Sequence, residues 1–289
     1  MFFWRSPTNL VLNNLQTMQS VIAPTESGLA LAVRGRGPDA VLIHGSLGDY
    51  RQWNAIVERL ESNYRVIAVS RRHHWPNPPP QPDISYTYEG HRADLQLFLH
   101  AIGHPTHVVG HSYGAGVALL AALHDGESIR SLTLIEPAFG SLLPAATPGL
   151  APELTSRESM VATVKAFVQE GDNERAAEAL IDWVQAGAGG FSQLTQTVRD
   201  GLLANAKTIG PNIAAPAPTL TCDELSVLHV PTLVLNGERT RMWYRLIGRA
   251  VAACVPGAQA ATIEAAGPMA IVENPTQTSM LLTQFIAEN

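Results

Sequence analysis

The stretch Gly110-His111-Ser112-Tyr113-Gly114 places a serine between two glycines. A short apolar run ends at Val109 just before it, and the Ala/Leu-rich residues 115–123 follow it. This pattern predicts that Ser112 sits on a tight turn from a buried strand into a helix, the arrangement of a nucleophile elbow. Glycine is needed at both flanks because a β-carbon there would collide with the strand and helix, and the serine backbone is strained. The alternative is a serine that only caps the helix.

Apolar runs and helical spacings before and after this turn alternate along the chain. Strands that alternate with helices predict an α/β fold with a doubly wound, mostly parallel sheet. A short strand at 20–23 is expected to pair antiparallel with 29–34. The other predicted strands are 40–43, 65–69, 107–109, 131–135, 232–235 and 260–263, and the predicted helices include 53–60, 91–102, 115–123 and 243–255.

The alternation stops between residues 139 and 223. Helical patterns such as 160–168 and 174–184 are separated there by Pro- and Gly-rich breaks. An all-helical insertion between two strands is most simply a cap over the carboxyl ends of the strands, where ligands bind in open α/β sheets. We therefore predict a core of residues 1–138 and 224–289, with 1–18 as an N-terminal extension, and a cap of residues 139–223.

Composition and charge narrow the classes of partner. The formal net charge is -6 and the basic residues are scattered, so we expect no nucleic-acid partner. No apolar stretch is long enough to cross a membrane, and Arg5 to Pro7 interrupt the apolar start before a signal peptide could form, which predicts a cytoplasmic location. We expect a small-molecule substrate, no membrane association, and a monomer or homodimer.

Cys222 and Cys254 lie far apart in sequence and lack the spacing of metal ligands. They are expected to be two reduced, mostly buried thiols rather than a disulfide. The sequence contains no metal-ligand cluster, phosphate loop or dinucleotide fingerprint, so no metal and no cofactor are predicted.

His44-Gly45, the turn at Ser112, the helical insertion and the order of strands together resemble the α/β-hydrolase superfamily over about residues 20–288. The resemblance implies an eight-stranded, mostly parallel sheet with a cap, and a triad of Ser, acid and His in that chain order. It implies Ser112 as nucleophile. The oxyanion hole would use the backbone N–H groups of Ser46 and Tyr113.

The acid of the implied triad has two candidates. Its usual position, after the strand 232–235, holds Thr240, with Glu238 two residues before it. Some members of the superfamily place the acid after the preceding strand, where this chain has Glu136. We favour Glu136 over Glu238, because a carboxylate at a buried strand end is otherwise costly. A Glu136 paired structurally with an arginine is the alternative.

The histidine of the implied triad is missing. The segment from Ala265 to Pro275 resembles the family's histidine loop, but Pro268 occupies the histidine position. Proline has no ionisable group and no N–H, so it cannot accept the proton of the Ser112 hydroxyl. Among other histidines His74 is the first candidate to replace it, although a packing or surface role is favoured.

The substrate pocket is expected to include six residues around these positions. The apolar cap and the implied oxyanion hole favour a small or medium, mostly apolar carbonyl or ester-type substrate. Three functions remain open: a serine hydrolase with a displaced base or a low rate, a non-hydrolytic cyclase, isomerase or lyase, and a catalytically silent ligand-binding protein. The predicted pocket residues are His44, Leu47, His111, Phe139, Pro268 and Met269.

Overall fold

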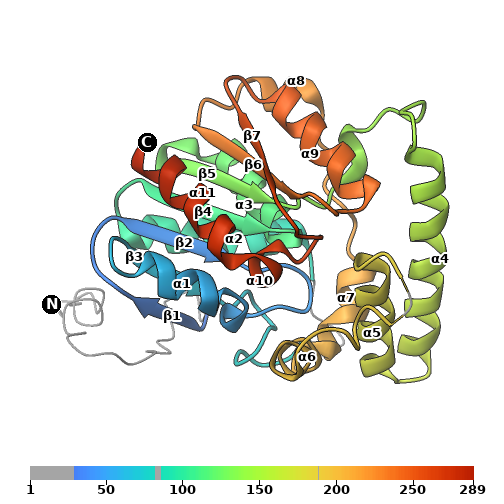
Figure 1. The fold of residues 1–289 in the computed structure, drawn as a ribbon. Coiled ribbons are helices and arrows are strands. Elements are labelled where there is room, and N and C mark those ends of the chain that lie inside the picture. The colour runs from blue at the N-terminus through green and yellow to red at the C-terminus, as the bar shows by residue number, and fades with distance from the viewer. Residues whose placement is uncertain (1–28, 82–85, 188) are drawn as a thin grey trace, which may run out of the picture.

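A computed structural model describes residues 29–81, 86–187 and 189–289 (Figure 1). The predicted N-terminal extension, 1–18, and the predicted strand at 20–23 lie outside these ranges.

The described residues form one sheet of seven strands in the order β1-β3-β2-β4-β5-β6-β7. Strand β1 pairs antiparallel with β3, and every other pair is parallel. This confirms the α/β fold with a mostly parallel sheet, whereas the resemblance implied eight strands. The strands are β1 (Leu31–Arg34), β2 (Asp39–Ile43), β3 (Arg65–Val69), β4 (Thr106–His111), β5 (Ile129–Ile135), β6 (Thr232–Gly237) and β7 (Gln259–Ile263).

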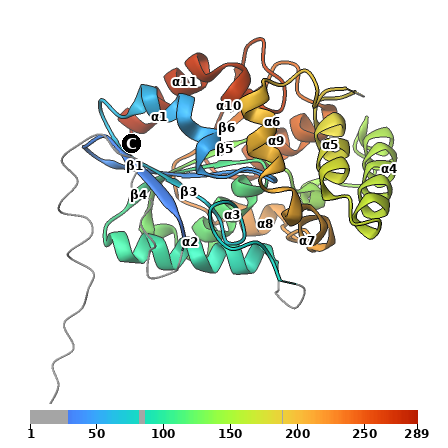
Figure 2. The same cartoon turned by 90° about the horizontal axis from the view of Figure 1, so that it is seen from below.

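Helices cover both faces of the sheet, which is why every residue of β2 and β4 is buried. Figure 2 shows α1 and α11 on one side of the sheet and α2 and α3 on the other. Two apolar clusters, one on each side, form the core. The covering helices are α1 (Asn54–Leu60), α2 (Tyr88–Ile102), α3 (Tyr113–His124), α9 (Met242–Cys254), α10 (Ala270–Glu273) and α11 (Pro275–Ala287).

Between β5 and β6 the described chain is helical, and α4 to α7 gather at one end of the sheet (Figure 1). These helices have an apolar cluster of their own, which Leu47 and Met269 join from the core. The cap boundaries at 139 and 223 stay a prediction. No helix in the described ranges is both long and apolar enough to span a bilayer. The inserted helices are α4 (Leu150–Gln169), α5 (Asn173–Val184), α6 (Gln196–Leu203), α7 (Ile209–Ala214) and α8 (Cys222–Ser226).

The prediction of two reduced thiols was wrong. Cys222 at the start of α8 and Cys254 at the end of α9 form a disulfide, with their Cα atoms 5.0 Å apart. The pairing depends on α8 packing against α9, which sequence spacing does not reveal. Disulfides persist mainly in oxidising compartments, so this bond weighs against the predicted cytoplasmic location, which stays a prediction.

Candidate active site

Ser112 lies between the end of β4 and the start of α3 with a φ of 52°. This left-handed backbone costs free energy in any residue other than glycine. Both flanking glycines are required by close backbone approach. A β-carbon on Gly114 would lie 2.3 Å from the carbonyl oxygen of Ile43, and one on Gly110 would lie 2.4 Å from that of Gly114. The turn therefore has the geometry expected of a nucleophile elbow.

Ser112 opens onto a cavity of about 120 Å³ between the sheet and the cap. Ser46, Tyr113, His111, Pro268 and Met269 also line it, as expected from the sequence. The remaining walls come mostly from the cap and from α9, and sequence reasoning did not identify them. They include Tyr88, Arg157, Met160, Leu180, Ile181, Trp183, Asn212, Trp243 and Tyr244.

Three residues predicted for the pocket lie elsewhere. The ring of His44 is fully buried between the backbone of Gly45 and that of Arg71. Leu47 packs into the apolar cluster of the cap. Phe139 is fully buried in the core cluster that contains α2, α3 and α9. In each case packing directs the side chain away from the cavity, although its neighbours in sequence reach it.

The two predicted oxyanion donors both line the cavity beside Ser112. A β-carbon on Gly45 would lie 3.1 Å from Cβ of Ser112, so the loop that carries Ser46 passes close to Ser112. Within the described ranges neither the N–H of Ser46 nor that of Tyr113 has a hydrogen-bond acceptor. Two fixed N–H donors without an acceptor can bind the negative charge that develops on a carbonyl oxygen.

The carboxylate of Glu136 is fully buried at the end of β5, where the residue has a φ of 50°. It accepts hydrogen bonds from the N–H of Gly237, from Nδ2 of Asn236 at 3.0 Å and from Oγ1 of Thr240 at 2.7 Å. Burial nevertheless raises its pKa to about 7. Glu238, by contrast, is exposed and accepts from the N–H of Ala265 at 2.9 Å. The geometry therefore fits Glu136 better than Glu238 as the acid of a triad.

The loop at Pro268 is held in place by hydrogen bonds to Glu273 and by packing against β6. The N–H groups of Gly267 and Met269 donate to the carboxylate of Glu273 at 2.6 and 3.2 Å. The loop also packs against the end of β6, since a β-carbon on Gly237 would lie 2.4 Å from the carbonyl oxygen of Ala266. Sequence reasoning missed Glu273, whose only signal was its short spacing after the loop.

Known proteins match this chain over most of its length. The profile of the Alpha/beta hydrolase family matches residues 40–279. The chain belongs to the α/β-hydrolase family. It is 27% identical over 268 residues to a pimeloyl-[acyl-carrier protein] methyl ester esterase from Methylococcus capsulatus, covering 91% of this chain and 100% of that protein.

Solved structures of α/β hydrolases agree with the fold. An α/β hydrolase from Sphaerobacter thermophilus superposes with a TM-score of 0.68 at 26% identity, covering 91% of this chain and 99% of that one. The carboxylesterase CesB from Bacillus subtilis superposes with a TM-score of 0.71 at 19% identity, covering 90% and 88%, which shows the fold alone. The relatives are thus hydrolases.

His74 does not replace the missing histidine of this α/β hydrolase in the observed geometry. Its ring is fully buried and both nitrogens are engaged, Nδ1 with the carbonyl of Gly48 at 2.7 Å and Nε2 with the hydroxyl of Tyr86 at 2.9 Å. Desolvation holds its pKa well below the usual value. His74 therefore holds the loop after Ser46 through the carbonyl of Gly48, and it is not among the residues that line the cavity.

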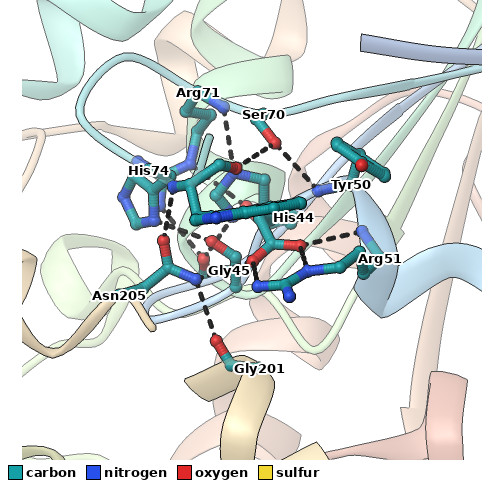
Figure 3. A network of polar contacts seen from close by, with 12 residues as sticks. His44, Gly45, Tyr50, Arg51, Ser70, Arg71, His74, Gly201 and Asn205 are labelled. Carbon is teal, nitrogen blue, oxygen red and sulfur yellow. Dashed lines mark hydrogen bonds and ion pairs between the residues drawn. The ribbon is translucent and has the colours of Figure 1, made fainter. Parts of the chain in front are cut away.

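Arg71 fixes the other side of the same loop (Figure 3). Its guanidinium donates to the carbonyl of Gly45 at 3.0 Å and to that of His44 at 3.2 Å, while its N–H donates to Nε2 of His44 at 2.9 Å. These bonds hold the backbone that carries the N–H of Ser46. His44 therefore helps to shape this loop through its ring and its carbonyl group.

Asn205 connects the cap to the same region (Figure 3). Its side chain accepts from the N–H of Trp75 at 2.7 Å and donates to Asp49 at 2.8 Å and to the carbonyl of Gly201 at 3.0 Å. Asn205 is only 2% exposed, so these bonds are protected from water. The cap is therefore attached by polar contacts as well as by apolar packing.

His111 lines the cavity and has one ring nitrogen without a hydrogen-bond partner among the described residues. Its Nε2 donates to the carbonyl of Pro268 at 3.0 Å, which leaves Nδ1 as the nitrogen without a proton. Nδ1 is buried and unpartnered among the described residues, and a β-carbon on Gly45 would lie 3.1 Å from it and from Cβ of Ser112. Burial lowers the pKa of His111 to about 4, so the ring is neutral at neutral pH.

Proposed function

We propose that this α/β hydrolase cleaves small or medium, mostly apolar carboxylic esters through Ser112, at a low rate and with His111 as a displaced base. The strained backbone of Ser112 is the observation that carries the proposal. A positive φ in a non-glycine residue costs on the order of 1–3 kcal/mol, and a nucleophile elbow is the arrangement that requires it. The hydrolase relatives and the apolar side chains around the cavity support the same function.

In the first half of the reaction Oγ of Ser112 forms a bond to the ester carbon, and the carbonyl electron pair moves onto oxygen. The N–H groups of Ser46 and Tyr113 bind that oxyanion. The hydroxyl proton passes to Nδ1 of His111 and then to the alcohol oxygen as the carbon–oxygen bond of the ester breaks. The alcohol leaves and an acyl ester on Ser112 remains.

In the second half a water molecule attacks the acyl carbon and gives its proton to Nδ1 of His111. Oγ of Ser112 leaves with that proton, so the carboxylic acid is released and the enzyme is restored. A base with a pKa near 4 accepts protons weakly, which is why we expect a low rate. Glu136 has no histidine to orient here, and we assign it the structural role of holding the turn after β6.

The test is intact-protein mass spectrometry after incubation with a fluorophosphonate. Labelling of the wild type but not of Ser112→Ala, with weaker labelling of His111→Gln, is the expected result. If Ser112 is not labelled and simple esters are not turned over, the proposal is wrong.

A second candidate is a protein that holds a carbonyl compound without covalent chemistry, either to rearrange it or only to bind it. The observation in its favour is that the Ser112 hydroxyl makes no hydrogen bond to any described residue, Nδ1 of His111 included. Ser112→Ala would then retain turnover or binding of the true ligand. A small-molecule partner is part of both candidates, and the oligomeric state stays a prediction.

A further inference from the structure

Arg157, on the cap helix α4, lines the same cavity as Ser112. Its guanidinium carbon lies 5.6 Å from the ring centre of Trp243, which fixes the outer part of the side chain against α9. Among the described residues no carboxylate pairs with it and no carbonyl accepts from it. The cavity wall therefore carries an unpaired positive charge.

The neighbouring acid that could neutralise Arg157 is already occupied. Glu153 lies one helical turn earlier on α4, at the spacing that pairs opposite charges. Its carboxylate instead accepts from Nε and Nη2 of Arg241 at 3.1 and 3.0 Å. No Asp or Glu is among the described residues that line the cavity. A half-buried cation without a counter-ion is unfavourable. The positive charge of Arg157 would therefore stabilise an anion that binds in the cavity.

Asn212, on α7, supplies a second unused donor. Its Nδ2 is buried without a hydrogen-bond partner, and the residue lines the same cavity. Helices α4 and α7 pack against each other, and both donors line the same cavity. A buried N–H group without an acceptor is rare in folded proteins and favours a ligand atom that can accept from it.

We propose that Arg157 and Asn212 bind a carboxylate at the far end of the acyl chain, so that the substrate is a half-ester of a dicarboxylic acid. This inference rests on the proposed ester hydrolysis for its reacting end. The planar guanidinium can donate two parallel hydrogen bonds to a carboxylate, and the amide of Asn212 adds a third. Met160 and Ile181, which also line the cavity, would contact the methylene chain.

The binding test uses Ser112→Ala, which cannot turn the ester over. Calorimetric titration with monomethyl esters of the series from succinate to suberate is compared with the neutral dimethyl esters. We expect the best half-ester to bind about 10- to 100-fold more tightly than its diester, and Arg157→Gln to abolish the difference. Lys165→Gln is the matched control, since it removes one exposed positive charge from the same helix and should preserve the preference.

Turnover separates failure of this inference from failure of the proposed function. A half-ester preference in binding without any hydrolysis would keep the carboxylate subsite and reject the esterase. Equal kcat/KM for half-ester and diester, unchanged in Arg157→Gln, would reject the subsite and keep the esterase. Asn212→Asp, which faces the same carboxylate with a negative charge, is expected to weaken half-ester binding and to spare the diester, and an unchanged half-ester affinity would count against the subsite.

Discussion

Nε2 of His111 donates a hydrogen bond to the carbonyl oxygen of Pro268 over 3.0 Å. This bond joins the turn at Ser112 to the loop at Pro268. Glu273 holds the same loop from its other side through two backbone N–H groups. The loop thus retains a defined shape although the residue at its centre has no proton to exchange.

Pro268→His is expected to complete a Ser, Glu, His triad in this otherwise intact frame. A positioned general base typically contributes about 10²- to 10⁴-fold, so kcat/KM for a simple ester should rise within that range. Steady-state kinetics on a chromogenic ester measure it. Pro268→Ala, which frees the backbone N–H without adding a base, should give no such gain, and an equal gain in both variants would show that loop flexibility is responsible.

Glu136 should become catalytically important only once a histidine is present. In the Pro268→His background, Glu136→Gln is expected to remove most of the gained activity, because an amide cannot stabilise the imidazolium. Glu238→Gln in the same background should leave the gain intact, since Glu238 is exposed and bound to the N–H of Ala265. The same ester assay decides between them, and the reverse ranking would identify Glu238 as the acid.

Folding buries several histidines in neutral form, which makes stability depend on pH. Their folded pKa values lie below the ordinary value of 6.5, and that of His111 is about 4. The unfolded chain therefore binds more protons than the folded chain below pH 6.5, so the free energy of unfolding falls as the pH falls below that value. For His107 and His111, whose folded pKa values are about 4, the limiting slope between pH 6.5 and 4 is about 1.4 kcal/mol per pH unit each. The buried set is His44, His74, His91, His107 and His111.

Denaturant unfolding at a series of pH values measures this dependence. Glu136 acts in the opposite direction, since its folded pKa is raised and its contribution is lost as the pH rises toward 7. His91, whose two ring nitrogens are buried and unpartnered, offers a variant: His91→Leu should flatten the slope. His229→Gln on the exposed surface should not change it. A flat profile in the wild type would contradict the burial of neutral imidazoles.

The disulfide between Cys222 and Cys254 should be visible in the intact mass of the unreduced protein. This mass should be lower than that of the reduced protein by two hydrogen atoms. The bond closes a segment of sequence separation 32, for which chain entropy predicts a stabilisation of about 3–4 kcal/mol. Cys254→Ser, or reduction of the wild type, is expected to lower the free energy of unfolding by that amount. Two free thiols under non-reducing conditions would refute the pairing.

Local rules account for the parts of the molecule that sequence reasoning predicted. The turn at Ser112 is specified by its own glycines, because the backbone contacts that exclude a β-carbon are made within a few residues and with the adjacent strand. Buried parallel strands can be recognised in a sequence as short apolar runs, as for β2 and β4. The fold and the geometry of the turn at Ser112 could therefore be predicted, whereas the role of Ser112 stays a prediction.

Long-range packing determines what the sequence did not reveal. Arg157 and Asn212 reach the cavity only because α4 and α7 fold over the sheet. Glu273 holds the loop at Pro268 only because its helix packs beside that loop. His44 and Phe139 were expected at the cavity from their neighbours in sequence, but side-chain direction followed packing.

Asn205 also attaches the cap to the core of the molecule. Its side chain bonds to Asp49 and to the N–H of Trp75, and Asp49 follows directly on the loop that carries Ser46. A cap that moved away from the core here would have to break those two hydrogen bonds of a buried amide. Because a buried amide without partners is costly, Asn205 favours the arrangement in which the cap stays closed on the core.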